Sequence, residues 1–119
     1  MREIKFRGIP LFGKELVYGS LIIDTNENGE KVYIIRRIES GKVSTFEVKE
    51  ETVGQYTGLK DKNDIEIYEH MELDNQFEVS FNQGSYILTN ISNGDIMTLH
   101  KYIKDKNGQV KITREYTKI

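Results

Sequence analysis

The sequence predicts an all-β fold, or a β-rich α+β fold with one or two short helical turns, in which antiparallel sheets form one or two small barrel-like modules. Apolar and polar residues alternate with a period of two along most of the chain, which is typical of half-buried strands. Turn-forming Asn and Gly residues recur about every 8–12 residues, the spacing of short strands in sheets and small barrels. No segment keeps a helical period of apolar residues over several turns.

The first half of the chain contains four predicted strands. Asn28 and Gly29 lie between the second and third, and because both residue types accept positive φ they predict a hairpin turn. Residues 39–41 predict another turn before the fourth strand. Gly19 interrupts the second strand and is interpreted as a β-bulge. The predicted strands are residues 3–7, 15–23, 31–38 and 43–48.

The second half begins with the β-prone segment 51–59. Its residues Gly54 and Gly58 weaken a regular strand and indicate bends or close backbone approach. A polar turn at residues 60–64 follows, and residues 69–73 predict a short helical turn. Four further strands, separated by turns rich in Asn and Gly, are predicted at residues 77–81, 85–91, 96–104 and 109–119.

The length predicts a single domain over residues 1–119, with an alternative of two sub-modules, an N-terminal β module at 1–68 and a small barrel-like module at 69–119. The chain has 37% hydrophobic residues and twelve aromatic ones, seven Tyr and five Phe. This apolar area predicts a folded rather than a disordered chain.

Several classes of protein are excluded by composition. The chain has no Cys, so disulfide frameworks, thiolate nucleophiles and thiolate metal sites are excluded. Its apolar runs are far too short for a membrane-spanning helix, and the charged N-terminal segment does not resemble a signal peptide. We therefore expect a cytoplasmic protein without membrane contact.

Three blocks of the sequence resemble the YopX family of small phage and prophage proteins. The opening MREIKFRG and the segment ELVYGSLI (15–22) are similar to family blocks, and TVGQYTGLKDKNDIEIYE (52–69) follows VGQYTGLKDKNGKEIYEGD almost residue by residue. Asp64 replaces a turn glycine of that pattern, and residues 69–73 depart from its EGDIV. The resemblance implies a β-rich fold and a phage or prophage setting in the host cell cytoplasm. It implies no established activity and no catalytic residues.

The chain's own residues also predict no catalytic, cofactor or metal site. The two histidines, His70 and His100, would need to converge with carboxylates to bind zinc, and we expect both at the surface. Neighbouring carboxylates are expected by coincidence among 19 acidic residues. No serine lies in a nucleophile-elbow motif, and no glycine-rich phosphate loop is present.

The candidate binding residues are aromatic side chains beside basic or small ones. Tyr33 with Arg36 and Arg37 has the composition that small β-barrels use to stack and neutralise single strands of nucleic acid. A second such set is Tyr102 with Lys101 and Lys104.

Gln55 and Tyr56 lie between two glycines, Gly54 and Gly58, and this block has two interpretations. It presents a ring to a partner, or it forms a bend whose tyrosine fills the core with its hydroxyl bonded, and we favour the bend.

The leading functional hypothesis is a non-catalytic binding or assembly module that self-associates, because a small β domain has exposed strand edges that pairing between copies protects. Phage or host proteins are further candidate partners. The alternative is a nucleic-acid-binding accessory domain of small β-barrel type, against which the net charge of −2 argues.

Overall fold

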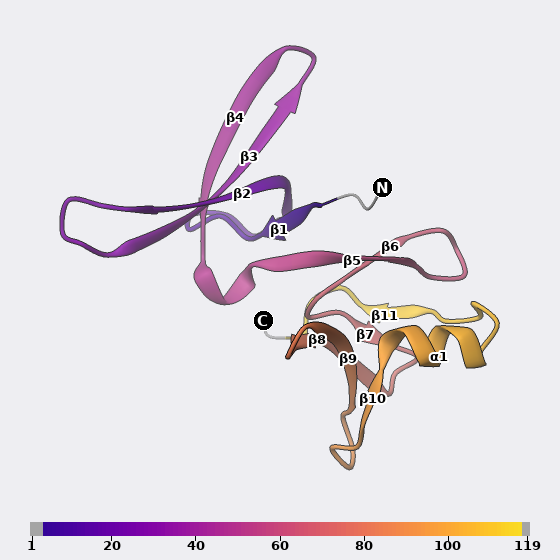
Figure 1. Cartoon of the computed structure of the whole chain (residues 1–119). Helices are drawn as coiled ribbons and strands as arrows, with labels where there is room; N and C mark the ends of the chain where they lie inside the picture. The colour runs from indigo at the N-terminus through magenta and orange to yellow at the C-terminus, as the bar shows by residue number, and fades with distance from the viewer. Residues whose placement is uncertain (1–3, 118–119) are drawn as a thin grey trace. The chain divides into compact units, whose positions relative to one another are not determined.

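The computed structural model describes residues 4–117 and divides the chain into two compact units, Met1–Gln55 and Tyr56–Ile119. Strands dominate both units and only one α-helix is present in the described residues, which confirms the β-rich prediction (Figure 1). Neither sheet closes into a barrel within these residues. The predicted single domain, and its alternative division after residue 68, stay predictions.

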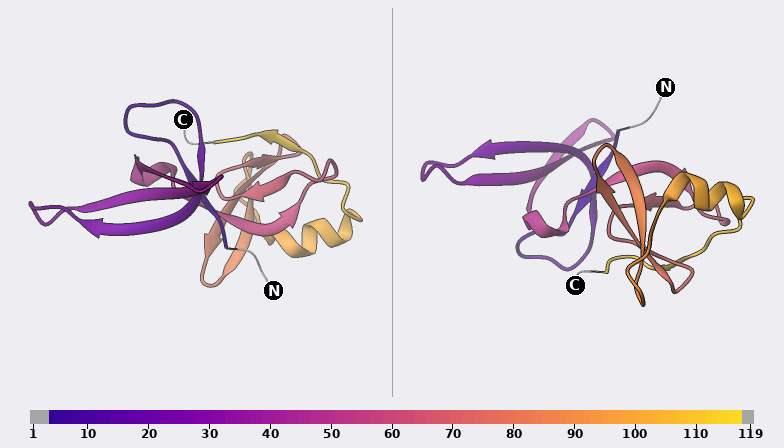
Figure 2. Two further views of the ribbon diagram at one scale, coloured as in Figure 1. Left: turned by 90° about the horizontal axis from the view of Figure 1, so that it is seen from above. Right: turned by 60° about the horizontal axis from the view of Figure 1, so that its bottom comes forward.

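The first unit is an antiparallel sheet with the strand order β4-β3-β2-β1-β5. The turns predicted at Asn28-Gly29 and at residues 39–41 join successive strands, so β2, β3 and β4 form two hairpins. We call the β2–β3 hairpin beyond β1 the first arm and the outer part of the β3–β4 hairpin the second arm (Figure 2). Residues 33–36 of β3 pair with both β2 and β4, so the sheet is three-stranded where the two arms meet. The strands are β1 (Phe6–Gly8), β2 (Val17–Thr25), β3 (Lys31–Glu39) and β4 (Lys42–Val48), followed by a 3-10 turn at Glu50–Thr52 and by β5 (Gly54–Lys60).

Gly19 is the residue at which β2 changes its partner strand. Before it, β2 pairs with β1, ending at the pair Phe6–Gly19; after it, β2 pairs with β3 from Ser20–Arg36 onward. A Cβ atom on Gly19 would lie 2.2 Å from the carbonyl oxygen of Arg36. The predicted bulge is therefore wrong, since the described pairs keep their register, and the glycine instead permits a close approach of two backbones.

Most of the outer edge of β4 near its end is covered by the chain that follows β1. Pro10 bridges Val48, the amide of Leu11 donates to the carbonyl of Glu47 at 3.0 Å, and the amide of Lys49 donates to the carbonyl of Ile9 at 2.9 Å. The Thr52 hydroxyl accepts from the Ile9 amide at 2.9 Å. These bonds leave only the first half of β4, residues 42–45, open at this edge.

The buried apolar set of the first unit is small. Among its described residues, Ile9, Ile35 and Val48 are the buried apolar side chains, and Arg7 is also fully buried. Gly8 packs its backbone against Val48, where a Cβ would lie 3.0 Å from the valine side chain. The arms extend beyond this core, so their outer parts gain little from it.

The second unit consists of a hairpin, a five-stranded antiparallel sheet and a helix. The sheet has the strand order β10-β9-β8-β7-β11. In the hairpin, the remainder of β5 pairs with β6 across the predicted turn at residues 60–64. The register shifts between Tyr56 and Lys60, a stretch that contains Gly58 with a φ of +84°. The elements are β6 (Glu66–Tyr68), β7 (Glu72–Leu73), β8 (Phe77–Asn82), β9 (Ser85–Asn90), β10 (Ile96–Thr98), α1 (Leu99–Asp105) and β11 (Ile112–Arg114).

Asp61 joins the β5–β6 turn to the strand β11. One carboxylate oxygen accepts from the amides of Asn63 at 2.8 Å and Ile65 at 2.9 Å, which closes the turn. The other accepts from the amide of Ile112 at 3.4 Å. Asp61 is buried, and these hydrogen bonds stabilise its negative charge while they provide acceptors for three backbone amides. Asp61 therefore organises this end of the unit.

The predicted strand at residues 96–104 is wrong beyond Thr98, because the chain continues as helix α1. The Thr98 hydroxyl caps the helix by accepting from the Lys101 amide, and Lys101 pairs with Asp105 one turn later at 2.7 Å. Leu99 and Tyr102 are buried on one face. Within residues 4–117 no helix has the length and apolarity needed to span a membrane.

The helical turn predicted at residues 69–73 is also wrong. His70 has a φ of +74°, its amide donates to the carbonyl of Val79 at 2.8 Å, and β7 begins at Glu72. Strand pairing with β8 therefore outweighs a local helical preference that spans only five residues. The predicted strand at 109–119 is shorter than expected: β11 covers Ile112–Arg114, and residues 118–119 lie outside the described part.

We expect Gly19→Ala to destabilise the protein by about 1–3 kcal/mol, because the new Cβ would overlap the Arg36 carbonyl and force two paired backbones apart. Urea denaturation measures the free energy of unfolding. Gly13→Ala is the control, since its Cβ would approach only the Pro10 side chain, at 3.3 Å, and a smaller loss is expected. Equal losses for both variants would contradict the role given to Gly19.

We expect Asp61→Ala to lower the free energy of unfolding by about 2 kcal/mol or more, since three backbone amides lose their acceptor. Asp95→Ala removes an exposed carboxylate from the same unit and should change stability by less than about 0.5 kcal/mol. Thermal unfolding of both variants followed by circular dichroism provides the comparison. A wild-type melting curve for Asp61→Ala would refute the assignment.

Candidate functional site

The predicted binding residues of β3 lie on both faces of the sheet. Tyr33 and Arg37 share one face, and Arg36 lies on the opposite one, because successive side chains of a strand alternate. The Tyr33 hydroxyl donates to Glu50 at 3.2 Å, and desolvation together with this carboxylate raises the pKa of the tyrosine. The Arg37 guanidinium lies over the Phe46 ring at 5.4 Å.

Arg36 is the exposed member of this set. It pairs with Ser20 on β2 and with Thr45 on β4, so its long side chain has a short polar neighbour on each side. The structure thus brings Tyr33 and Arg37 to one surface and separates Arg36 from them.

The other candidate tyrosines are buried. Tyr56 is 5% exposed, and its ring packs against Tyr68 with centroids 5.4 Å apart, while Gln55 precedes it as the last residue of the first unit. Tyr102 donates to the Asp74 carboxylate at 2.6 Å, and desolvation and this bond raise its pKa above the ordinary range. Both rings are buried, whereas Tyr33 is half-buried.

The two histidines do not join a cluster of metal ligands. Among residues 4–117, no group of three or more His, Cys, Asp or Glu side chains converges. The His70 ring meets Tyr116 edge-on at 5.5 Å, and His100 lies exposed on α1.

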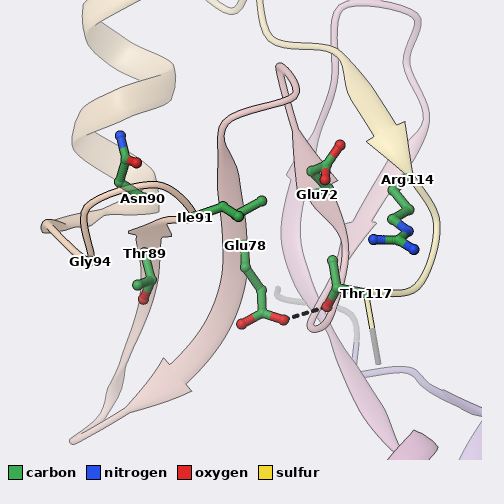
Figure 3. Close-up of a pocket in the computed structure, with 8 residues that line it drawn as sticks. All are labelled: Glu72, Glu78, Thr89, Asn90, Ile91, Gly94, Arg114 and Thr117. Carbon is green, nitrogen blue, oxygen red and sulfur yellow. Dashed lines mark hydrogen bonds between the residues drawn. The ribbon is translucent and has the colours of Figure 1, made fainter. Parts of the chain in front are cut away.

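A cavity of about 420 Å³ lies over one face of the sheet in the second unit (Figure 3). Its floor is a row of side chains on neighbouring strands, with Arg114 paired to Glu72, Glu72 paired to Glu78, and Glu78 paired to Thr89. The lining residues are Glu72, Glu78, Thr89, Asn90, Ile91, Gly94, Arg114 and Thr117.

Two hydroxyl groups orient the two carboxylates of the cavity. Thr113 donates to Glu72 at 2.8 Å, and Thr117 donates to Glu78, the bond drawn in Figure 3. Two carboxylates and one guanidinium provide acceptors and donors for a small polar ligand. Like charges on directly opposite strand positions destabilise a sheet, so the glutamate pair is a cost to the fold.

Sequence analysis did not pair Glu72 with Glu78. The signal was the pair of apolar residues 73 and 77, which lie at equal distance from residue 75 and pair in the structure, but the helical turn predicted at residues 69–73 hides this register. Counting one residue outward on each strand brings the glutamates together. The exposed apolar residues of the arms were missed as well, because alternation alone does not show which face another element covers.

Large apolar side chains are exposed on both arms of the first unit and on the loop after β1. On the first arm, Ile22 is 37% and Ile23 is 54% exposed. On the second arm, Ile38 is 66% and Val43 is 54% exposed, and these two residues pair across the hairpin. Phe12, in the loop, is fully exposed.

A comparison with family models matches residues 5–116 to the model described as YopX protein. This match covers nearly the whole chain and includes the block 52–69, which confirms the resemblance predicted from the sequence. A search of curated proteins finds no match.

We expect Glu78→Gln to raise the free energy of unfolding by about 0.2–1 kcal/mol, because it removes the repulsion with Glu72 and keeps an acceptor for the Thr117 hydroxyl. The gain, measured by urea denaturation, should shrink in added salt. Glu47→Gln, opposite the apolar Ile34, is the control and should show no gain. A loss of stability in Glu78→Gln would contradict the repulsion.

Proposed function

The chain belongs to the YopX family, and we propose that it is a non-catalytic binding or assembly module that self-associates. In this proposal it works in the cytoplasm of a host cell as part of a phage or prophage programme. Phage or host proteins are its further candidate partners.

The exposed apolar arms of the first unit carry the proposal. An isolated two-stranded hairpin is at best marginally stable in water, and a third strand or a packed face is needed to stabilise it. The second arm is two-stranded at residues 37–39 and 42–44, where Ile38 and Val43 are exposed. On the first arm, Ile22 and Ile23 are exposed where β2, β3 and β4 form three strands, and residues 24–25 and 31–32 continue as two strands. A second copy of the chain supplies the missing contact.

The polar contacts of the first unit favour a surface that binds protein over one that binds nucleic acid. Tyr33 is bonded to an acidic residue, Glu50, and Arg37 stacks on Phe46. Binding to single-stranded nucleic acid remains the alternative prediction. Retention on immobilised single-stranded DNA that weakens with rising salt would favour it.

We expect purified wild-type protein to sediment with a mass above that of one 13.9 kDa protomer, and the fraction of larger species to rise with protein concentration. Analytical ultracentrifugation over a wide range of protein concentrations measures this. Nuclease-treated samples serve as the control, since they remove any nucleic acid that links protomers. A monomer at the highest concentration would overturn self-association.

A further inference from the structure

We infer that the exposed face of the sheet formed by β2, β3 and β4 packs against the same face of a second copy of this chain, with Arg36 beside Glu47 of the partner subunit. The inference rests on the proposed self-association and names the surface that performs it. We call this surface the outer face, and its residues are Ser20, Ile22, Ile34, Arg36, Ile38, Val43, Thr45 and Glu47.

The two faces of this sheet differ in burial. Successive side chains of a strand lie on opposite faces, so Ile35 and its neighbours form one face, and Arg36 and Ile38 belong to the other. On the first face Ile35 is 0% and Val48 is 2% exposed, which makes it the side of the core. Arg36 and Ile38 are both exposed, so the outer face is the one left for a partner.

Apolar side chains flank the centre of the outer face on two sides. Ile22 lies opposite Ile34 in the row before Arg36, and Ile38 lies opposite Val43 in the row after it. Ile22, Ile38 and Val43 are exposed, and Ile34 is half-buried. Removal of such a patch from water favours association.

Arg36 and Glu47 supply opposite charges within the same face. Arg36 lies in the row between Ser20 and Thr45, and Glu47 lies in the next row beside Ile34, so the two residues are diagonal neighbours about 7–8 Å apart. In the described part of the chain neither of these two side chains takes part in an ion pair. Both charges can therefore pair with a partner.

A two-fold axis makes the outer face complementary to itself. Let the axis run parallel to the sheets and across the strands, between the row of Arg36 and the row of Glu47. Arg36 then lies over Ile34 of the partner subunit and beside Glu47 of the partner subunit, and the symmetry produces this contact twice. Packed sheets lie about 10 Å apart, a distance that an arginine and a glutamate bridge together.

The charge pattern is the reason to name a second copy as the occupant. A partner must supply a carboxylate near Arg36 and a cation near Glu47, in two adjacent rows. The outer face itself carries both groups at that spacing. Packing through the face also avoids the edge of β4, which the chain after β1 covers next to Glu47.

Charge reversal tests the pair. Arg36→Glu places two carboxylates at each contact, and Glu47→Arg places two cations there, so each variant alone should associate about tenfold more weakly than wild type. A mixture of the two variants restores opposite signs at both contacts and should associate about as strongly as wild type. Sedimentation of each variant and of the mixture measures these association constants.

The mixture separates contact between copies from contact within one chain. Each variant keeps like charges at its own diagonal positions, alone or mixed, so only a contact between copies responds to mixing. Lys62→Glu makes the same change of charge as Arg36→Glu on an exposed turn of the second unit. It is the control, and it should associate as wild type does.

A second test uses the apolar part of the outer face. Ile38→Lys should weaken association about tenfold, because it places a charge against the partner's apolar patch. Its fold should be unchanged by circular dichroism, since Ile38 is exposed. Ile96→Lys alters an equally exposed residue of the second unit, at 65%, and should leave association unchanged.

The outcomes separate this inference from the proposed function. If wild type self-associates and the outer-face variants do so equally well, or if mixing fails to restore association, the outer face is overturned as the interface and self-association stands. A wild-type monomer at all concentrations overturns both.

Discussion

The architecture of the first unit depends on the close approach of the β2 backbone at Gly19 to the carbonyl group of Arg36. Only a residue without a Cβ permits it, since that atom would lie 2.2 Å from the oxygen. Because of this approach, β2 pairs with β1 on one edge before the glycine and with β3 on the other edge after it. The first arm is a result of this change of partner.

The block that resembles the YopX family has a structural explanation in the second unit. Thr57 donates to the carbonyl of Ile67 at 2.8 Å, Asp61 closes the β5–β6 turn, and Tyr56 packs against Tyr68. Asp64, where the family pattern has a glycine, adopts a φ of +65°, so the turn keeps its left-handed residue. The residues that identify the family thus build the fold, which is why family membership alone does not name a ligand.

Alternation and turn residues predicted most strands from the sequence, but not where a strand gives way to a helix. Residues 96–104 contain alternating apolar residues together with a capping threonine, Thr98, and an apolar pair at helical spacing, Leu99 and Tyr102. Packing of that pair decided the conformation. The candidate surface was predicted only in part. The helical turn predicted at residues 69–73 hid the pairing of Glu72 with Glu78, and the pairing of Arg36 with Ser20 depends on the register of a hairpin whose strands are nine residues long.

The cover over β4 limits where a strand of another molecule can pair with the first sheet. A sheet grows into a filament when each subunit offers one free side to the subunit before it and another to the subunit after it. Here Pro10 and the amide of Leu11 occupy much of the β4 edge, next to Val48 and Glu47. The second half of β4 is therefore withdrawn from edge-to-edge growth of the sheet.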